Sequence, residues 1–167
     1  MRTALDAPGD ILDEGERRFV GEIRTHGWFR TSVFADAQGP GFSYTTGLWV
    51  SVRHPELIVF GLSDSTAHAV FWDVFRNIQD GHSVEVGTRT DGIFGNAAAY
   101  ALPVASKHYE DYLGWSRWFY AGNDFPCLLI VWPDAANAFP WEASFDASFL
   151  TAQTDLTEDG WGARPSS

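Results

Sequence analysis

Cysteine is almost absent from this chain of 167 residues, with Cys127 as the single example. One cysteine excludes a disulfide within the chain and a cluster of thiolate ligands around a metal. Cys127 lies in the apolar run over residues 126–132, where a thiol usually packs as a small hydrophobic side chain. We therefore predict a buried, unreactive cysteine.

Basic residues are scarce as well. The chain has 11 Lys and Arg against 22 Asp and Glu, which gives a formal net charge of −11. This charge repels phosphate backbones and anionic membrane surfaces, so neither nucleic acid nor a membrane is an expected partner. An acidic surface serves solubility, and it also suits a basic protein as partner.

Several familiar signatures are also missing. No segment approaches the roughly 20 apolar residues of a membrane helix, and the N-terminus has no apolar stretch of signal-peptide length, which predicts a cytoplasmic location. The sequence contains no Gly-x-Gly-x-x-Gly segment, no phosphate-loop lysine motif and no Gly-x-Ser-x-Gly motif. An enzyme that depends on a nucleoside triphosphate, a dinucleotide or a nucleophile elbow is therefore disfavoured.

Aromatic residues are plentiful by contrast. Thirteen Phe, eight Trp and five Tyr make up 16% of the chain. Rings at this density are expected to line a pocket or an interface as well as to fill the core.

The apolar pattern predicts one domain over residues 1–153 and a polar C-terminal tail over residues 154–167. Runs of β-branched and aromatic residues predict strands over residues 28–34, 42–50, 57–62, 83–90, 93–105 and 126–132. Helical spacing predicts about three helices, which end at Gly27, Gly81 and Gly122. Because helices and strands do not alternate strictly, the fold class is α+β with a mostly antiparallel sheet, either open or curled like a split barrel.

Side chains with hydroxyl groups interrupt the apolar pattern of the strand predicted to begin at Phe42. Tyr44, Thr45 and Thr46 follow one another there, either as cross-strand hydrogen-bonding residues or as contacts for a ligand. His54 stands before Pro55, in a loop beside two strands, where it either presents an imidazole for general-base catalysis or bonds the backbone of its own turn.

A second group of candidates begins the third predicted helix. His108 precedes Tyr109 and Tyr112, and Trp118 follows on the same predicted helix. An imidazole beside phenols and indoles is either a general base or a hydrogen-bonding partner of a neighbouring ring. No metal is expected, because His68 and Trp72 stand four residues apart with no second His or carboxylate at zinc-site spacing.

A family resemblance rests mainly on His26-Gly27-Trp28, on Phe42-Ser43-Tyr44-Thr45-Thr46-Gly47-Leu48 and on residues 54–57, 61–62, 108–109, 132–134 and 139–142. On these segments the chain resembles a bacterial family known only as domain of unknown function 4262, over residues 15–153. The resemblance implies no established reaction.

The order of predicted elements over residues 44–86 is also similar to that of flavin reductases of the split-barrel type. That likeness implies a curled sheet, flavin as a cofactor, and phosphate contacts near Ser63, Ser65 or Thr66 at a helix N-terminus.

Two functions are consistent with these patterns. In the first, the protein binds a planar, flavin-like small molecule in an aromatic pocket lined by Tyr44, Thr45, Thr46, His54, His108, Tyr109, Tyr112 and Trp118. In the second, it is an acidic protein-interaction module, such as an immunity protein that neutralises a basic toxin. The sequence leaves both catalysis and the oligomeric state open, a homodimer included.

Overall fold

The computed structural model describes residues 2–161 of the chain. Five strands form one sheet in the order β1-β2-β3-β5-β4. Their bounds are Phe29–Val33 (β1), Phe42–Thr46 (β2), Glu56–Phe60 (β3), Tyr100–Pro103 (β4) and Cys127–Val131 (β5). All neighbouring pairs are antiparallel except β3 and β5, which run parallel.

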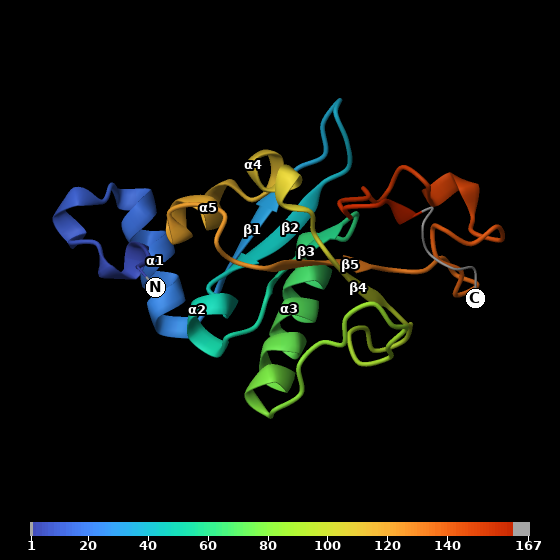
Figure 1. Ribbon diagram of the computed structural model, residues 1–167, viewed down its shortest axis with the longest axis horizontal. Coiled ribbons are helices and arrows are strands. Elements are labelled where there is room, and N and C mark those ends of the chain that lie inside the picture. Colours follow the sequence, from blue (N-terminus) through green and yellow to red (C-terminus); the bar gives the residue numbers. More distant parts are fainter. Residues whose placement is uncertain (1, 162–167) are drawn as a thin grey trace.

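The sheet is open, with β1 and β4 at its two edges (Figure 1). The prediction of an α+β fold with a mostly antiparallel sheet is therefore confirmed, and the curled, split-barrel-like form is not observed. The parallel β3–β5 pair requires a long crossover, and α3 and β4 both lie in the chain between these two strands.

Five α-helices occur among residues 2–161. They are α1 (Glu14–His26), α2 (Leu48–Val52), α3 (Asp64–Gln79), α4 (Tyr109–Tyr112) and α5 (Gly114–Tyr120). Short 3-10 turns are η1 (Ala4–Asp6), η2 (Gly9–Ile11), η3 (Ser106–His108) and η4 (Ala147–Phe149). Over the same residues, no helix has the length and apolar character of a membrane span.

Helix α3 covers one face of the sheet (Figure 1). Ser63 caps its first turn by accepting a hydrogen bond from the Thr66 amide, and its inward side chains repeat with helical period. This core contains Ala67, Val70, Phe71, Val74 and Phe75 of the helix against Leu57, Val59, Leu128 and Ile130 of the sheet. The predicted helix after Ser63 is thereby confirmed.

Helices α1, α4 and α5 lie on the opposite face of the sheet (Figure 1). The alternate residues of the central strands, Ile58, Phe60, Leu129 and Val131, pack there with Phe19 and Ile23 of α1 and Phe119 of α5. Both β3 and β5 are therefore buried on two faces, which explains the continuous apolar sequence of β5 and of β3 after Glu56. Cys127 belongs to this second core and is buried, as predicted.

The strand predicted over residues 42–50 is wrong in its second half. β2 ends at Thr46, Gly47 turns the chain with φ 117°, and residues 48–52 form α2. Trp49, Val50 and Val52 favour a strand by their intrinsic propensities. The contacts of the first turn of α2, described below, override those preferences.

The strand predicted over residues 83–90 is also wrong, and that over 93–105 shrinks to Tyr100–Pro103. Residues 83–99 form an irregular loop, which is attached to β4 by the backbone bond from Gly87 N to Ala101 O at 2.9 Å and closed on itself by the Thr90–Ala99 bridge. Glu85 and Val86 are both exposed, so the alternation of polar and apolar residues there does not correspond to one buried and one exposed face of a strand.

The predicted third helix is divided at Leu113, whose φ of −113° and ψ of 44° are not helical. Gly114 then opens α5. The expected C-terminal tail is partly packed, since Leu156 is buried and its carbonyl accepts the Ala105 amide at 2.8 Å. Residues 162–167 of the tail lie outside the described part of the chain.

Candidate functional site

The carboxylate of Glu56, at the start of β3, is completely buried and accepts five hydrogen bonds. Three come from consecutive amides at the start of α2: Gly47 N at 3.0 Å, Leu48 N at 3.2 Å and Trp49 N at 3.2 Å. The other two come from Thr45 Oγ1 at 2.7 Å and from Tyr120 Oη at 2.5 Å. Because the amides of residues 47–49 bond this carboxylate, the chain turns away from the sheet after β2 and begins α2.

Burial governs the titration of this cluster. Loss of solvation raises the pKa of Glu56, while the bonds from Tyr120, Thr45 and the amides act in the opposite direction. Burial and the nearby Glu56 raise the pKa values of Tyr120 and Cys127, so the phenol remains a donor and the thiol remains protonated. The cluster is a fixed structural connection rather than an exposed reactive group.

The predicted ligand residues of β2 all face protein. The Tyr44 hydroxyl accepts the Trp115 amide at 3.1 Å, and Thr46 Oγ1 lies 2.6 Å from Ser116 Oγ. Thr45 donates to Glu56 while it accepts the Leu57 amide at 3.0 Å. The structure therefore uses this hydroxyl-rich strand to attach α5 and α2 to the sheet.

His54 is buried, with 4% of its surface exposed, and both ring nitrogens have partners. Nε2 accepts the Val84 amide at 3.2 Å, so Nδ1 carries the proton and donates it to the Pro55 carbonyl at 2.9 Å. Burial lowers the pKa of His54, against a smaller opposing effect of the Pro55 carbonyl. The imidazole connects the residue 83–99 loop to the sheet.

This geometry predicts a pH-dependent stability. Protonated His54 cannot accept the Val84 amide, so the free energy of unfolding should be highest above pH ~6.5, the ordinary pKa, and should fall as the pH decreases through the lower pKa of the folded state. We expect urea unfolding between pH 8 and pH 5 to show a smaller decrease for His54→Gln than for the unchanged protein. Parallel curves for the two proteins would contradict this role.

The second group of candidates is dispersed. Tyr109 is buried and donates its hydroxyl to the Phe125 carbonyl at 2.8 Å. His108 and Tyr112 are half-buried, with ring centroids 6.3 Å apart, and Trp118 lines a separate cavity against the N-terminal arm. His54 bonds Val84 and Pro55 rather than this group, so the two histidines do not share one cluster of hydrogen bonds.

Tyr112 does line a cavity, which we call the hairpin cavity. It has a volume of about 340 Å³ and lies between the β1–β2 hairpin, α4 and Thr154. Its lining residues are Val33, Phe34, Asp36, Gln38, Gly39, Pro40, Phe42, Phe60, Asp111, Tyr112 and Thr154. A volume of this size is at the lower end of the range for small-molecule sites.

Four rings take part in the lining of the hairpin cavity, beside several polar residues. Phe42, Phe60 and Tyr112 contact one another with centroids 5.2–5.6 Å apart, and Phe34 at its edge is 83% exposed. Sequence reasoning found Tyr112 but missed Phe34, Asp36 and Asp111. The available signal was a Phe placed immediately before the polar Asp36 to Pro40 turn, where no core is expected.

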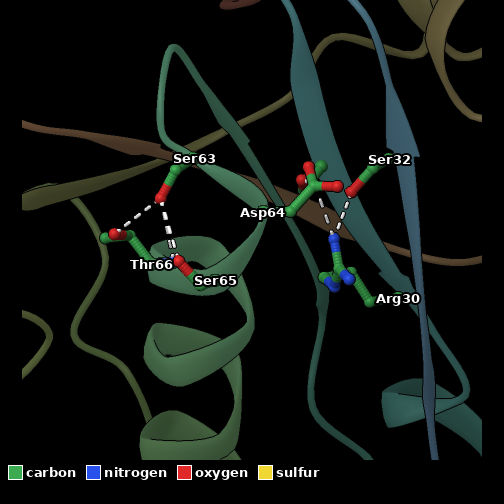
Figure 2. A network of polar contacts seen from close by, with 7 residues as sticks. Arg30, Ser32, Ser63, Asp64, Ser65 and Thr66 are labelled. Carbon is green, nitrogen blue, oxygen red and sulfur yellow. Dashed lines mark hydrogen bonds and ion pairs between the residues drawn. The ribbon is translucent and has the colours of Figure 1, made fainter.

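Figure 2 shows the polar network beside the N-terminus of α3, where phosphate contacts were expected. Ser63 Oγ donates to Thr66 Oγ1 at 2.9 Å and accepts the Thr66 amide at 3.2 Å. Arg30 bonds Ser32 and lies 3.6 Å from the carboxylate of Asp64. The hydroxyls thus complete the cap and a carboxylate already pairs the arginine, so this network has little capacity left for a phosphate.

Within residues 2–161, no group of three or more His, Cys, Asp or Glu residues is arranged to hold a metal ion. A shared metal site therefore does not account for the histidines among these residues.

Comparison with known proteins identifies a family but no activity. The family described as "Domain of unknown function (DUF4262)" matches residues 22–146, about three quarters of the chain, which confirms the family resemblance. No curated protein and no solved structure matches the chain significantly. Function must therefore be argued from the geometry of the cavities.

Proposed function

We propose that this chain, which belongs to the DUF4262 family, is a cytoplasmic small-molecule-binding domain whose ligand is a planar aromatic compound with a flavin-like ring system. The observation that carries the proposal is the hairpin cavity, whose mixed polar and aromatic lining includes the rings of Phe34, Phe42 and Tyr112, with the buried ring of Phe60 behind them. Aromatic walls favour flat, apolar ring systems, which they contact by stacked and edge-on packing.

The exposed ring of Phe34 supports this proposal. An 83% exposed Phe contributes almost nothing to the core, yet it borders the cavity directly. A ligand that enters against Tyr112 would cover Phe34 and remove its apolar surface from water, at roughly 25 cal/mol per Å². A substitution of Phe34 should therefore change ligand binding while it leaves the folding stability almost unchanged.

The charges of the cavity restrict the ligand. Its ionisable lining residues are Asp36 and Asp111, and both are exposed. Carboxylates repel a phosphate group, whereas they attract cationic groups and accept hydrogen bonds from ring N–H donors. The preferred ligand is therefore a neutral or cationic heterocycle rather than a phosphorylated flavin.

Fluorescence titrations with riboflavin, proflavine and flavin mononucleotide test the proposal. We expect saturable binding of riboflavin and proflavine, which are neutral and cationic, and at least tenfold weaker binding of the phosphorylated compound. Phe34→Ala should weaken binding about tenfold through loss of one aromatic contact. Its folding stability should stay within about 0.5 kcal/mol of the unchanged protein.

Phe149→Ala is the matched control, because Phe149 is also exposed, at 40%, and does not line the hairpin cavity. Its affinity should equal that of the unchanged protein. Absence of binding for all three compounds, or equal affinities of the Phe34→Ala and Phe149→Ala proteins, would remove the basis of the proposal.

A second candidate uses the same surface. The combination of exposed Phe34 with Asp36 and Asp111, in a chain of net charge −11, also suits a basic protein that inserts a side chain into the cavity. In that case none of the three compounds binds. A basic protein instead co-purifies at low salt, and both high salt and Phe34→Ala release it.

A further inference from the structure

We propose that a second pocket, between α1 and α3, binds a small alkylammonium cation, such as a trimethylammonium group. We call it the α1–α3 pocket. It has a volume of about 270 Å³ and is lined by Glu22, His26, Trp28, Phe29, His68 and Trp72. It shares no lining residue with the hairpin cavity, so the two proposals stand or fall separately.

The lining of the α1–α3 pocket consists of five rings and one carboxylate. Trp28 is 4% exposed and forms the most buried part, Trp72 and Phe29 are half-buried, and His26 and His68 are exposed at the rim. No aliphatic side chain takes part. Aliphatic side chains would serve equally well in a pocket whose only effect was to bury apolar surface, so a lining made of rings indicates a ligand that aromatic groups bind.

Trp72 stands at a steep angle to its ring neighbours in the pocket, whereas the rings of Trp28 and His68 are inclined by only 35° with centroids 5.7 Å apart. The indoles of Trp28 and Trp72 are 5.5 Å apart with an interplanar angle of 84°, and the His68 ring is perpendicular to Trp72 at 6.5 Å. His26 adds a further edge-on contact with Trp72 at 6.5 Å and 80°. Walls that meet at right angles offer ring faces to one central group from different sides, which suits a compact cation better than a flat ligand.

The surrounding charges favour a cation. Glu22 is the carboxylate of the lining, and its Oε2 lies 3.4 Å from Nε2 of His26. The two nearby arginines are each paired with a carboxylate: Arg30 with Asp64 at 3.6 Å and Arg76 with Asp73 at 2.6 Å. Among residues 2–161, Glu22 is thus the carboxylate of the pocket that is paired with an imidazole, His26, rather than with an arginine.

Two further observations agree with this assignment. The guanidinium of Arg76 lies 5.5 Å from the centroid of the Trp72 ring, so this indole already holds one cation by a cation–π contact. Desolvation, and less so the positive charge of Arg30, lowers the pKa of His68, so this imidazole adds no positive charge to the pocket beyond that of Arg30, which Asp64 pairs. A neutral wall does not repel a cationic ligand.

The test compares choline with 3,3-dimethylbutanol, which has the same shape but carries carbon in place of the charged nitrogen. Binding is followed by tryptophan fluorescence and by calorimetry with the complete chain. We expect choline to bind at least tenfold more tightly than the neutral compound. Equal affinities would show a merely apolar pocket and would overturn the proposal, as would the absence of choline binding.

Three variants locate the site. Trp72→Ala should weaken choline binding about tenfold, the loss expected for one cation–π contact, while Trp72→Phe should retain part of the affinity. Glu22→Gln, which preserves shape and removes charge, should weaken choline binding several-fold and leave 3,3-dimethylbutanol unaffected. Trp115→Ala is the control, because Trp115 lies on α5 and does not line the pocket. Unchanged choline affinity in Trp72→Ala would contradict the assignment.

Discussion

Replacement of Glu56 by glutamine is expected to lower the free energy of unfolding by about 3–5 kcal/mol. A carboxylate offers acceptors on both oxygens, and here each oxygen is surrounded by donors: Thr45 and Leu48 bond Oε1, while Gly47, Trp49 and Tyr120 bond Oε2. The carboxamide of glutamine replaces one oxygen with an NH₂ group. Whichever oxygen is replaced, at least one backbone amide and one hydroxyl then face a donor and lose their acceptor.

The hydroxyl protons also favour a carboxylate at this position. Thr45 Oγ1 accepts the Leu57 amide at 3.0 Å, and the Tyr120 hydroxyl accepts the Val50 amide at 3.4 Å. Both hydroxyls therefore direct their own protons toward Glu56. Tyr120→Phe removes one of these donors from a buried carboxylate and should cost about 1.5–3 kcal/mol.

Urea unfolding at pH 7 measures both changes. Glu158→Gln is the matched control, since Glu158 is exposed, and it should change stability by less than about 0.5 kcal/mol. A Glu56→Gln protein as stable as this control would mean that the five hydrogen bonds do not hold α2 in place.

Replacement of Gly47 by alanine is expected to cost about 3 kcal/mol or more. Gly47 has a φ of 117°, a conformation that L-residues rarely adopt. A Cβ at this position would lie 2.6 Å from the Gly27 carbonyl oxygen and 2.9 Å from the Trp28 Cα. Both neighbours are backbone atoms, so the end of α1 and the start of β1 would have to move to relieve the overlap.

Gly21→Ala provides the comparison within the same protein. Gly21 lies inside α1, and a Cβ there would meet nothing within 4 Å. Alanine should therefore stabilise the helix by about 0.5–1 kcal/mol. Thermal and urea unfolding of the two variants should shift in opposite directions. A Gly47→Ala protein within about 1 kcal/mol of the unchanged protein would contradict the close approach.

The sequence predicted the elements whose causes are local. The Ser63 cap and the apolar stripe of α3 lie within one segment, and the continuous apolar runs at 57–62 and 126–132 reflect burial on both faces. Each of these sequence patterns lies within one short segment, so the element can be predicted without knowledge of the segments that pack against it. The α+β class and the mostly antiparallel sheet followed from these elements.

The candidate site was predicted less completely. Aromatic density indicated that rings would line a cavity, and Tyr112 does so together with Phe42 and Phe60. Tyr44, Thr45 and Thr46 instead bond α5, Glu56 and Ser116, because the hydroxyls of a strand serve a packed neighbour as well as they serve a ligand. Sequence alone does not distinguish the two.

By itself, then, the sequence determined the acidic charge, the fold class and the buried central strands. Only the tertiary structure decided that residues 48–52 leave the sheet as α2, that both ring nitrogens of His54 bond the backbone, and where the two cavities lie. The physical reason is that these features depend on contacts between distant segments, as when Glu56 binds both α2 and the Tyr120 hydroxyl 64 residues away. Such contacts exist only after the chain has folded, and here they outweigh the local preference of Leu48 to Val52 for a strand.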